Sequence, residues 1–248
     1  MWKTWILAAA LAMATAAQNL PEPRYLVEPG WKPLLNGRDL EGWHAADGKP
    51  LEWFATTAVR WDRESAPFAL HAQPAAGGLI LNSAAGKTAN LVSDATFGDV
   101  ELYLEFFLAR GSNSGVYVHG LYEVQVKDSY GVEHPTSHDC GGIYERQVPG
   151  KGGVGGTAPL RNASKPAGEW QTFEIRFRAP RFDAAGRKIE NARFLRVLHN
   201  GILVQDNVEA EGPTTSPLPI VEAPSNPLML QGDHGPVAYR NIYIRPLR

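Results

Sequence analysis

Alternation of apolar and polar side chains in strand-length runs is the feature of this sequence that most limits its possible folds. In VELYLEFFLA (residues 100–109), one face of the strand consists of Leu102, Leu104, Phe106 and Leu108, and the other consists of Glu101, Tyr103, Glu105 and Phe107. The run TFEIRFRA (172–179) has the same period of two. Because successive side chains of a strand point to opposite faces, these runs predict antiparallel strands with one face on a core.

Further runs predict more strands of the same kind. They are 77–83, 90–94, 113–131 as a hairpin, 170–179, 193–207 and 237–247. Asn200-Gly201 lies between two apolar runs, which predicts a hairpin with arms 193–198 and 202–205. With 25 glycines, 19 prolines and few helix-period stretches, the chain is expected to form one all-β domain over 31–248.

Two long polar insertions interrupt the strand pattern, at about 128–168 and 207–227. Both exceed the usual length of a connection, so they are expected to be functional loops or mobile segments. The glycine-rich GKGGVGG (150–156) lies in the first of them, and a flexible loop of this kind can act as a lid. Neither GKGGVGG nor AGKT (85–88) has the glycine spacing and following helix of a phosphate-binding loop.

The N-terminus has the layout of a secretory signal peptide over residues 1–17. Lys3 precedes an apolar run to Met13, and small residues lead to a cleavage site near Ala17. A proline-rich, extended lead-in is expected over 18–30. We therefore expect a periplasmic or secreted protein. Its single cysteine, Cys140, allows no internal disulfide, so stability must come from the core.

Charge and composition limit the possible partners. The formal net charge is −2, with 44% hydrophobic residues and no long basic run. With this charge balance, the chain is not expected to bind nucleic acid or, after signal cleavage, a membrane by electrostatic attraction. A small neutral molecule is the better expectation for the ligand.

The segment EHPTSHDC brings together four residues of types that bind metals: His134, His138, Asp139 and Cys140. Pro135 disfavours a helix that would present both histidines on one face, and no second cluster stands nearby. No cofactor is predicted, although a metal site here stays an alternative to a polar loop. Cys140 is more typical of a buried thiol than of a nucleophile, because the sequence shows no paired base.

The hairpin NSGVYVHGLYEVQVKDSYG (113–131) carries one file of valines and one file of polar side chains. A three-residue connection over 120–122 would place His119 opposite Glu123 and Tyr117 opposite Gln125. That register gathers the valines on one face and predicts a polar face with Asn113 and Asp128 near its ends. A second polar cluster follows near the C-terminus, and it consists of Gln231, Asp233, His234 and Arg240.

Several ordered blocks of the sequence resemble the 3-keto-disaccharide hydrolase domain family. They are WKPLLNGRDLEGW, FGDVELYLEFFLARGSNSGVYVHGLYEVQVKDSYG, GGIY, KPAGEWQTFEIRFRAPRF, HNGILVQDN and LQGDHGPVAYRNIYIRPL. The resemblance covers nearly all of 31–248. It implies a concanavalin-like lectin/glucanase jelly roll, a two-sheet antiparallel sandwich with a concave, sugar-facing surface. It also implies cleavage of glycosides that carry a ketone at sugar carbon 3.

Such chemistry needs a base for the hydrogen on carbon 2, an oxyanion stabiliser and a donor to the leaving group. We expect Glu123 to be the base and His119 to orient it or act as the acid. His234 and Arg240 are expected to stabilise the enolate or protonate the leaving oxygen. The remaining candidates, as substrate-binding or supporting residues, are Asn113, Tyr117, Gln125, Asp128, Tyr144 and Asp233. His138 is a further possible participant.

Two other functions remain open at this point. A jelly roll of this type could bind a carbohydrate without cleaving it. Alternatively, the histidine and aspartate side chains could support a metal-assisted sugar lyase.

Overall fold

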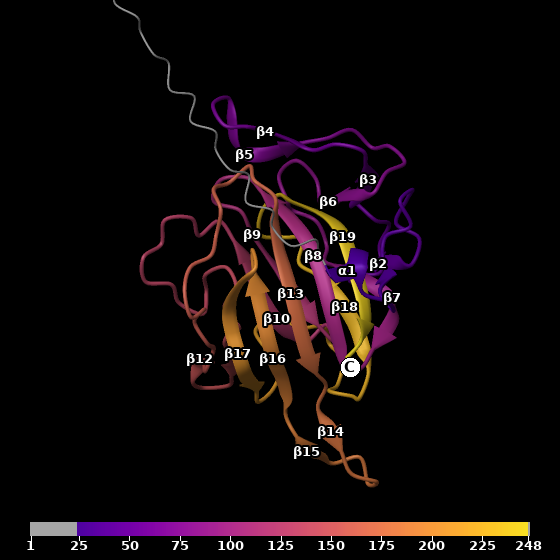
Figure 1. Ribbon diagram of the computed structural model, residues 1–248, viewed down its shortest axis with the longest axis vertical. Coiled ribbons are helices and arrows are strands. Elements are labelled where there is room, and N and C mark those ends of the chain that lie inside the picture. The colour runs from indigo at the N-terminus through magenta and orange to yellow at the C-terminus, as the bar shows by residue number, and fades with distance from the viewer. Residues whose placement is uncertain (1–23, 248) are drawn as a thin grey trace, which may run out of the picture.

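The computed structural model describes residues 24–247, and its strands form two main antiparallel sheets (Figure 1). The larger sheet consists, in spatial order, of β17 (Ile202–Ala210), β16 (Ala192–His199), β13 (Gln171–Arg178), β8 (Val100–Leu108), β19 (Val237–Pro246), β6 (Leu79–Leu81) and β3 (Phe54–Thr56), with β1 (Lys32–Pro33) paired to β19. The smaller sheet consists of β10 (Tyr122–Lys127), β9 (Asn113–Val118), β18 (Asn226–Leu230), β7 (Leu91–Phe97) and β2 (Trp43–Ala45).

Three two-stranded ribbons extend from these sheets. They are β4 (Arg60–Asp62) with β5 (Ala66–His71), β11 (Arg146–Val148) with β12 (Gly152–Val154), and β14 (Arg181–Phe182) with β15 (Lys188–Glu190). The one helix of the described residues is α1 (Arg24–Val27). The predicted all-β jelly-roll class is confirmed. No helix within residues 24–247 has the length and apolar character needed to span a bilayer.

The core lies between the two sheets, where alternate side chains of each strand meet. Leu104 and Phe106 of β8 and Phe173 of β13 belong to the same buried cluster as Val116 and Val124 of the smaller sheet. The predicted strands all occur, and the Asn200-Gly201 turn joins β16 to β17 with positive φ at both residues, as a tight hairpin requires. The valine file of the 113–131 hairpin faces this core, as expected.

The outer face of the larger sheet is also covered at its centre, so every residue of β8 is buried rather than every second one. Tyr25 of α1 stacks on Tyr243 with ring centroids 4.2 Å apart and lies 4.5 Å from Tyr103. The lead-in over 18–30 is therefore not wholly extended, because residues 24–27 form a helical turn that docks on the sheet. The predicted signal peptide and residues 18–23 lie outside the described residues.

A buried ion pair fastens this covering segment to the sheet. The Arg245 Nε donates to Glu101 Oε2 at 2.9 Å, and each side chain is 3% exposed. Arg245 also bonds Glu28 and stacks its guanidinium 4.5 Å from the ring centre of Trp31. One arginine thus links the last strand, β8 and the segment that follows α1.

We expect Arg245→Ala to lower the free energy of unfolding by about 3 kcal/mol, because it leaves the Glu101 carboxylate buried with less compensation. Arg187→Ala is the matched control, since Arg187 forms an ion pair with Asp183 that is exposed to solvent and should contribute roughly 0–1 kcal/mol. Urea denaturation of both variants measures the difference. Equal losses would contradict the prediction.

Candidate functional site

The β9–β10 hairpin sets the position of the candidate base. Its paired residues are Tyr122 with Val118, Glu123 with Tyr117, Gln125 with Gly115 and Lys127 with Asn113. The connecting residues are therefore 119–121, one position earlier than predicted. The three-residue loop length was right, but Glu123 lies opposite Tyr117 and not opposite His119.

Burial of Tyr122 explains this register. Tyr122 is fully buried, and its ring packs 5.5 Å from that of Phe177 in the opposite sheet. Removing a large aromatic side chain from water stabilises the fold by roughly 1.5–3 kcal/mol. The predicted register would have left Tyr122 in the turn, whereas the observed one puts it beside the valines on the core face.

The prediction that His119 pairs with Glu123 is therefore wrong. His119 lies in the turn with a φ of 59°, its ring is buried 5.0 Å from Phe177, and its Nε2 is 3.1 Å from the Gly98 carbonyl oxygen. Burial lowers the pKa of this imidazole. It is a neutral core side chain on the opposite face of the hairpin from Glu123.

The outward face of the hairpin forms the floor of a pocket of about 110 Å³. The wall residues come from both strands, from the two long insertions and from the loop before β19. They are Asn113, Tyr117, Glu123, Gln125, Tyr144, Thr215, Ser216, Gln231 and His234. The pocket therefore unites the hairpin with Gln231 and His234 of the C-terminal polar cluster.

The first insertion reaches the pocket by covering the free edge of β10. Ile143 forms an isolated bridge with Val124, and the Tyr144 N–H donates to the Glu123 carbonyl oxygen at 3.2 Å. The Tyr144 ring stacks on His138, with centroids 4.6 Å apart and planes 19° apart. His138 in turn lies 3.1 Å from Glu145. His138 therefore supports the pocket wall from behind.

The second insertion is tied to the same hairpin. The Glu123 N–H donates to Thr214 Oγ1 at 3.0 Å, and the Tyr117 hydroxyl donates to the Thr215 carbonyl oxygen at 3.0 Å. Thr215 also bonds the Glu145 carbonyl through its N–H and its hydroxyl. Both insertions thus have ordered, hydrogen-bonded positions over the site, which fits the functional-loop alternative.

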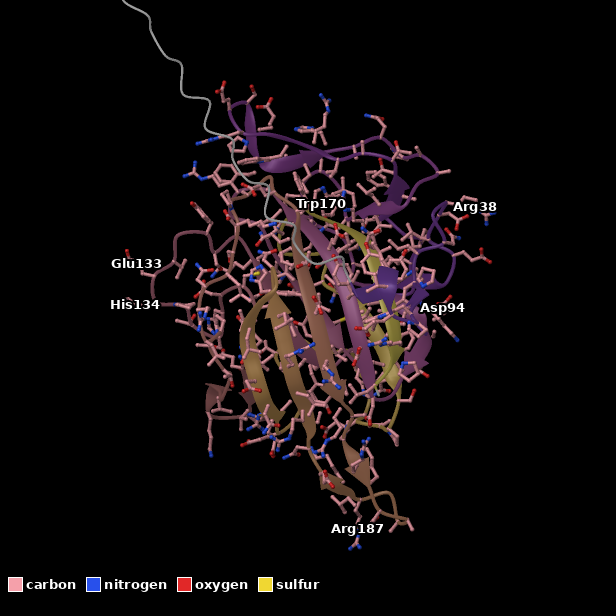
Figure 2. The ribbon with its side chains drawn as sticks, in the orientation of Figure 1. Arg38, Asp94, Glu133, His134, Trp170 and Arg187 are labelled. Carbon is pink, nitrogen blue, oxygen red and sulfur yellow. The ribbon has the colours of Figure 1, made fainter. Side chains whose placement is uncertain are left out.

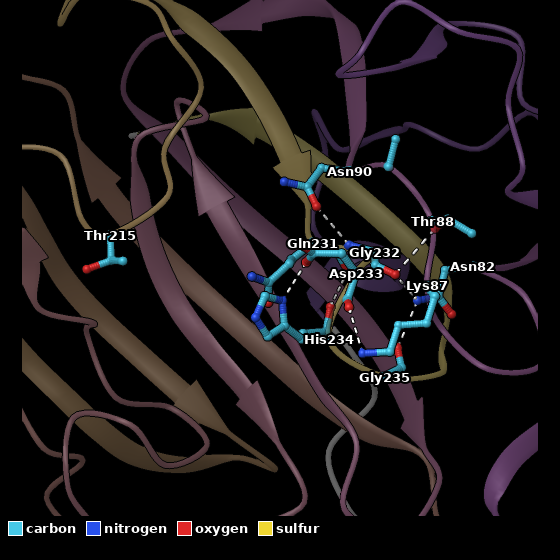
Figure 3. Close-up of polar contacts among 12 residues, drawn as sticks. Asn82, Lys87, Thr88, Asn90, Thr215, Gln231, Gly232, Asp233, His234 and Gly235 are labelled. Atoms are coloured by element: carbon cyan, nitrogen blue, oxygen red, sulfur yellow. Dashed lines mark hydrogen bonds and ion pairs between the residues drawn. The ribbon is translucent and has the colours of Figure 1, made fainter.

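The loop that carries His234 is held by side chains from residues 82–90 (Figure 3). Asn82 donates to the carbonyl oxygens of Gly232 and Gly235, and the Gly232 N–H donates to Asn90. Within the loop, His234 Nδ1 lies 2.5 Å from Asp233 Oδ1. The imidazole is therefore oriented by a carboxylate at the edge of the pocket.

Gly115 makes room for the carboxylate of Glu123. A Cβ at this position would lie 2.2 Å from Glu123 Oε1 and 2.8 Å from the Tyr117 ring. The Glu123 carboxylate and the Tyr117 ring therefore lie against the β9 backbone at Gly115, where no side chain intervenes. A glycine within an alternating strand signals such a close approach, and Gly115 was not among the predicted site residues.

The environment of Glu123 favours its protonated form. Burial raises the pKa of this carboxyl to about 8, the nearby charge of Asp233 adds to the rise, and a hydrogen bond with Tyr117 opposes it. Burial and the neighbouring Glu123 also raise the pKa of Tyr117, so its phenol stays neutral. A carboxyl with a pKa near neutrality is suited to proton transfer.

Three amide side chains around Glu123 have a free hydrogen-bonding atom. The buried Oδ1 of Asn113 and the Oε1 atoms of Gln125 and Gln231 have no hydrogen-bond partner within residues 24–247. Buried polar atoms are nearly always paired, so an unpaired set at one pocket indicates groups that await a ligand. Amides recognise hydroxyl-bearing ligands well, because they both donate and accept.

Three other predicted site residues lie away from the pocket wall. Arg240 is on the outer face of the larger sheet, where its Nε donates to Glu105 at 2.6 Å and its guanidinium covers Trp170. Its placement in the site is wrong, since alternation along β19 directs it away from the core and from the smaller sheet. Asp128 accepts from the Gly111 N–H in a neighbouring turn. Asp233 affects the pocket indirectly, because its carboxylate orients His234 and its negative charge raises the pKa of Glu123.

The metal-site alternative finds no support in the side-chain arrangement. No group of three or more His, Cys, Asp or Glu side chains could hold a metal ion within the described range. Asp139 accepts hydrogen bonds from Thr136 and Ser129, and Cys140 is buried with a pKa raised by burial to about 12. His134 lies on an outer loop (Figure 2).

Comparison with known proteins identifies the family. The model of the 3-keto-alpha-glucoside-1,2-lyase-like domain matches residues 30–245. The chain belongs to this family. The predicted family resemblance is confirmed, and no curated protein matches the sequence.

Solved structures share the fold. A "putative glycosyl hydrolase" from Parabacteroides distasonis is 25% identical, with a TM-score of 0.62 over 88% of this chain and 84% of that one. A second from the same organism is 22% identical, with a TM-score of 0.55 over 88% and 99%. A third is 15% identical, with a TM-score of 0.54 over 93% and 99%. Family and fold together support a carbohydrate-active jelly-roll protein.

The raised pKa of Glu123 predicts a pH-dependent stability. Between about pH 4.5 and 8 the folded chain keeps a proton that the unfolded chain releases, so stability falls as pH rises through this window. Glu123→Gln removes the dependence. Relative to the wild type, the free energy of unfolding of Glu123→Gln should be about 4 kcal/mol higher at pH 8.5 than at pH 4.5. Thermal or urea unfolding across this range measures it, with the exposed Glu133→Gln as control. A gain that does not change with pH would refute the assignment.

Proposed function

We propose that the chain cleaves the glycosidic bond of 3-keto-glycosides at the Glu123 pocket. The observation that carries the proposal is a buried carboxyl with a pKa of about 8, surrounded by side-chain amides with unpaired oxygens. A proton-transfer group and a set of hydroxyl-binding groups thus occur in one pocket. The family supports the 3-keto-sugar as the substrate class.

The reaction begins with removal of the hydrogen on carbon 2, which the ketone at carbon 3 acidifies. The proton passes to Glu123, the C–H electron pair forms a double bond between carbons 2 and 3, and the ketone oxygen becomes an enolate. The enolate then re-forms the ketone, the double bond moves to carbons 1 and 2, and the carbon 1–oxygen bond breaks. The leaving oxygen keeps that electron pair and takes up a proton. Water adding across the new double bond completes hydrolysis; otherwise the unsaturated ketone is the product.

The pocket offers a group for each requirement of this sequence. Glu123 takes the proton in its carboxylate form. His234, oriented by Asp233, is placed at the pocket wall to stabilise the enolate or to protonate the leaving oxygen. Asn113, Gln125 and Gln231 bind sugar hydroxyls, and Tyr117 and Tyr144 complete the walls.

An ordinary glycosidase mechanism fits the site less well. That mechanism uses two carboxyl groups on either side of the glycosidic bond. Among the described residues, Glu123 is the single carboxyl in the pocket wall. A mechanism that begins with one base is therefore the better match.

The decisive experiment compares a 3-keto-glucoside carrying a coloured aglycone with the unoxidised glucoside. We expect release of the aglycone from the ketone alone. Release from the unoxidised glucoside would favour an ordinary glycosidase. Binding without release from either would favour a carbohydrate-binding module.

Glu123→Gln should lower kcat by about a hundredfold or more, because the amide cannot accept the proton. In the wild type, kcat/KM should rise with pH to a plateau with a midpoint near 8, since the base must first lose its own proton. Steady-state kinetics from pH 5 to 10 test both, with Glu133→Gln as the control. Full activity of Glu123→Gln would exclude this residue as the base.

Gly115→Ala should lower kcat/KM by at least tenfold, because the new methyl group displaces the Glu123 carboxylate and the Tyr117 ring. Gly78→Ala is the matched control, since a Cβ there has no atom within 4 Å. Kinetics of both variants at the pH optimum decide the matter. Equal activity of the two would mean that the close approach over Gly115 has no role.

We also propose that the protein is exported, from the signal-peptide layout of residues 1–17. Expression of the full chain in a bacterium, followed by N-terminal sequencing of the periplasmic and secreted fractions, tests it. A mature protein that begins near Gln18 is expected. An intact N-terminus in the cytoplasm would contradict export.

A further inference from the structure

The single proton of the Tyr117 hydroxyl has two acceptors in the Glu123 pocket. The hydroxyl donates to the Thr215 carbonyl oxygen at 3.0 Å. It also forms the side-chain hydrogen bond that lowers the pKa of Glu123. A phenol has one proton to donate and lone pairs with which to accept. Tyr117 therefore cannot donate fully to the carbonyl and to the carboxylate at the same time.

Packing fixes the ring that carries this hydroxyl. Tyr117 lies directly opposite Glu123 in the hairpin and is 1% exposed. Its ring packs in a small apolar cluster with Val92, Met229 and Leu218. The ring is therefore held in place, and rotation about the bond between ring and oxygen is the motion that can turn the proton from one acceptor to the other.

The charge of Glu123 decides which acceptor the proton faces. An ionised carboxylate accepts a stronger hydrogen bond than a neutral carbonyl, so Tyr117 donates to Glu123 while the carboxylate is charged. Once protonated, the carboxyl donates its own O–H to the Tyr117 oxygen, and the phenol proton turns to Thr215. Tyr117 keeps its proton in both states, because burial raises the pKa of its phenol.

The other titratable groups that face Glu123 do not supply such a donor to the ionised form. Asp233 raises the pKa of Glu123 through its negative charge, whereas Tyr117 lowers it. Tyr144 belongs to the opposite wall of the pocket, and the hydroxyl of Tyr239 is bonded to Ser114. The imidazole of His234, at the edge of the pocket, is engaged through Nδ1 with Asp233.

We propose that Tyr117 is a positioning residue whose hydroxyl binds the ionised Glu123 before the reaction and the Thr215 carbonyl after Glu123 has taken up a proton. Proton uptake then moves one hydrogen bond from the base to the second insertion. Thr215 also bonds the Glu145 carbonyl of the first insertion through its N–H and its hydroxyl. Both loops over the pocket are thus linked to the protonation of the base. This inference rests on the proposed function, because it takes Glu123 as the base.

Tyr117→Phe removes the hydroxyl and keeps the ring. The midpoint of kcat/KM against pH for the 3-keto-glucoside should rise by about one pH unit or more, as expected for a lost hydrogen bond to a charged group. At pH 7, kcat/KM should therefore fall about tenfold or more, and the plateau at high pH should stay within about fivefold of the wild type. A uniform loss at every pH, with the midpoint unchanged, would overturn the proposal.

Tyr122→Phe is the matched control, because it removes a second buried tyrosine hydroxyl from the same hairpin. The Tyr122 hydroxyl donates to Glu222 Oε1 at 2.6 Å, on the face of the hairpin turned away from the pocket. We expect the midpoint of its pH profile to equal that of the wild type. A shift as large as that of Tyr117→Phe would show that the effect comes from a weakened hairpin.

An infrared titration separates this inference from the proposed function. The C=O stretch of the protonated Glu123 carboxyl is the band that Glu123→Gln removes, and its intensity against pH needs no substrate. If the wild type cleaves no 3-keto-glucoside, the reaction assignment fails, but Tyr117→Phe should still raise the midpoint of this band by about one pH unit or more. An unchanged midpoint would overturn the role of Tyr117.

Hydrogen exchange tests the link to the second insertion. At pH 6, where Glu123 is protonated, the backbone amides of 207–227 should exchange about threefold or more faster in Tyr117→Phe than in the wild type. At pH 9.5, where the wild-type hydroxyl faces Glu123, the two proteins should exchange alike. Comparison at equal pH cancels the intrinsic pH dependence of exchange. The same ratio at both pH values would contradict the movement of the hydrogen bond.

Discussion

Burial of one face of the β9–β10 hairpin is the constraint on which the site depends. Four valines and Tyr122 pack between the sheets, and a strand cannot place them there without turning the intervening residues outward. Glu123 and Gln125 therefore face the pocket because their neighbours face the core. A shift of the strand by one residue would reverse both faces, so the hydrophobic core and the proposed catalytic base are specified together.

The two long insertions convert this polar face into a pocket. Each lies against the hairpin and bonds its backbone, the first through Tyr144 and the second through Thr214. These contacts take Glu123 out of water, which raises the pKa of its carboxyl toward neutrality. The same insertions also line a neighbouring cavity of about 170 Å³, which shares Tyr144 with the Glu123 pocket. Loops on a rigid sandwich thus provide both the electrostatic environment and the room for a substrate.

The strands could be predicted where apolar and polar residues alternated over a long run and turn residues marked the end of that run. Asn200-Gly201 gave the β16–β17 hairpin, and the alternating run at 100–109 gave β8. The strand β18 was not predicted, and its first two residues lie inside the insertion expected over 207–227. The covering of the outer face of the larger sheet by Tyr25 and Arg245 could not be predicted either, because those contacts join residues far apart in the chain.

The sequence by itself determined the all-β fold, the family, and a set of polar residues that includes Glu123, Gln125 and His234, since these follow from local alternation and from ordered motifs. Only the tertiary structure decided which of those residues meet. Burial of Tyr122 against Phe177 set the hairpin register and sent His119 into the core. Arg240 of β19 lies on the outer face of the larger sheet, where it bonds Glu105, and is therefore outside the site. Both outcomes depend on packing between residues that are far apart in the chain. The alternation of residues within one strand carries no information about such packing.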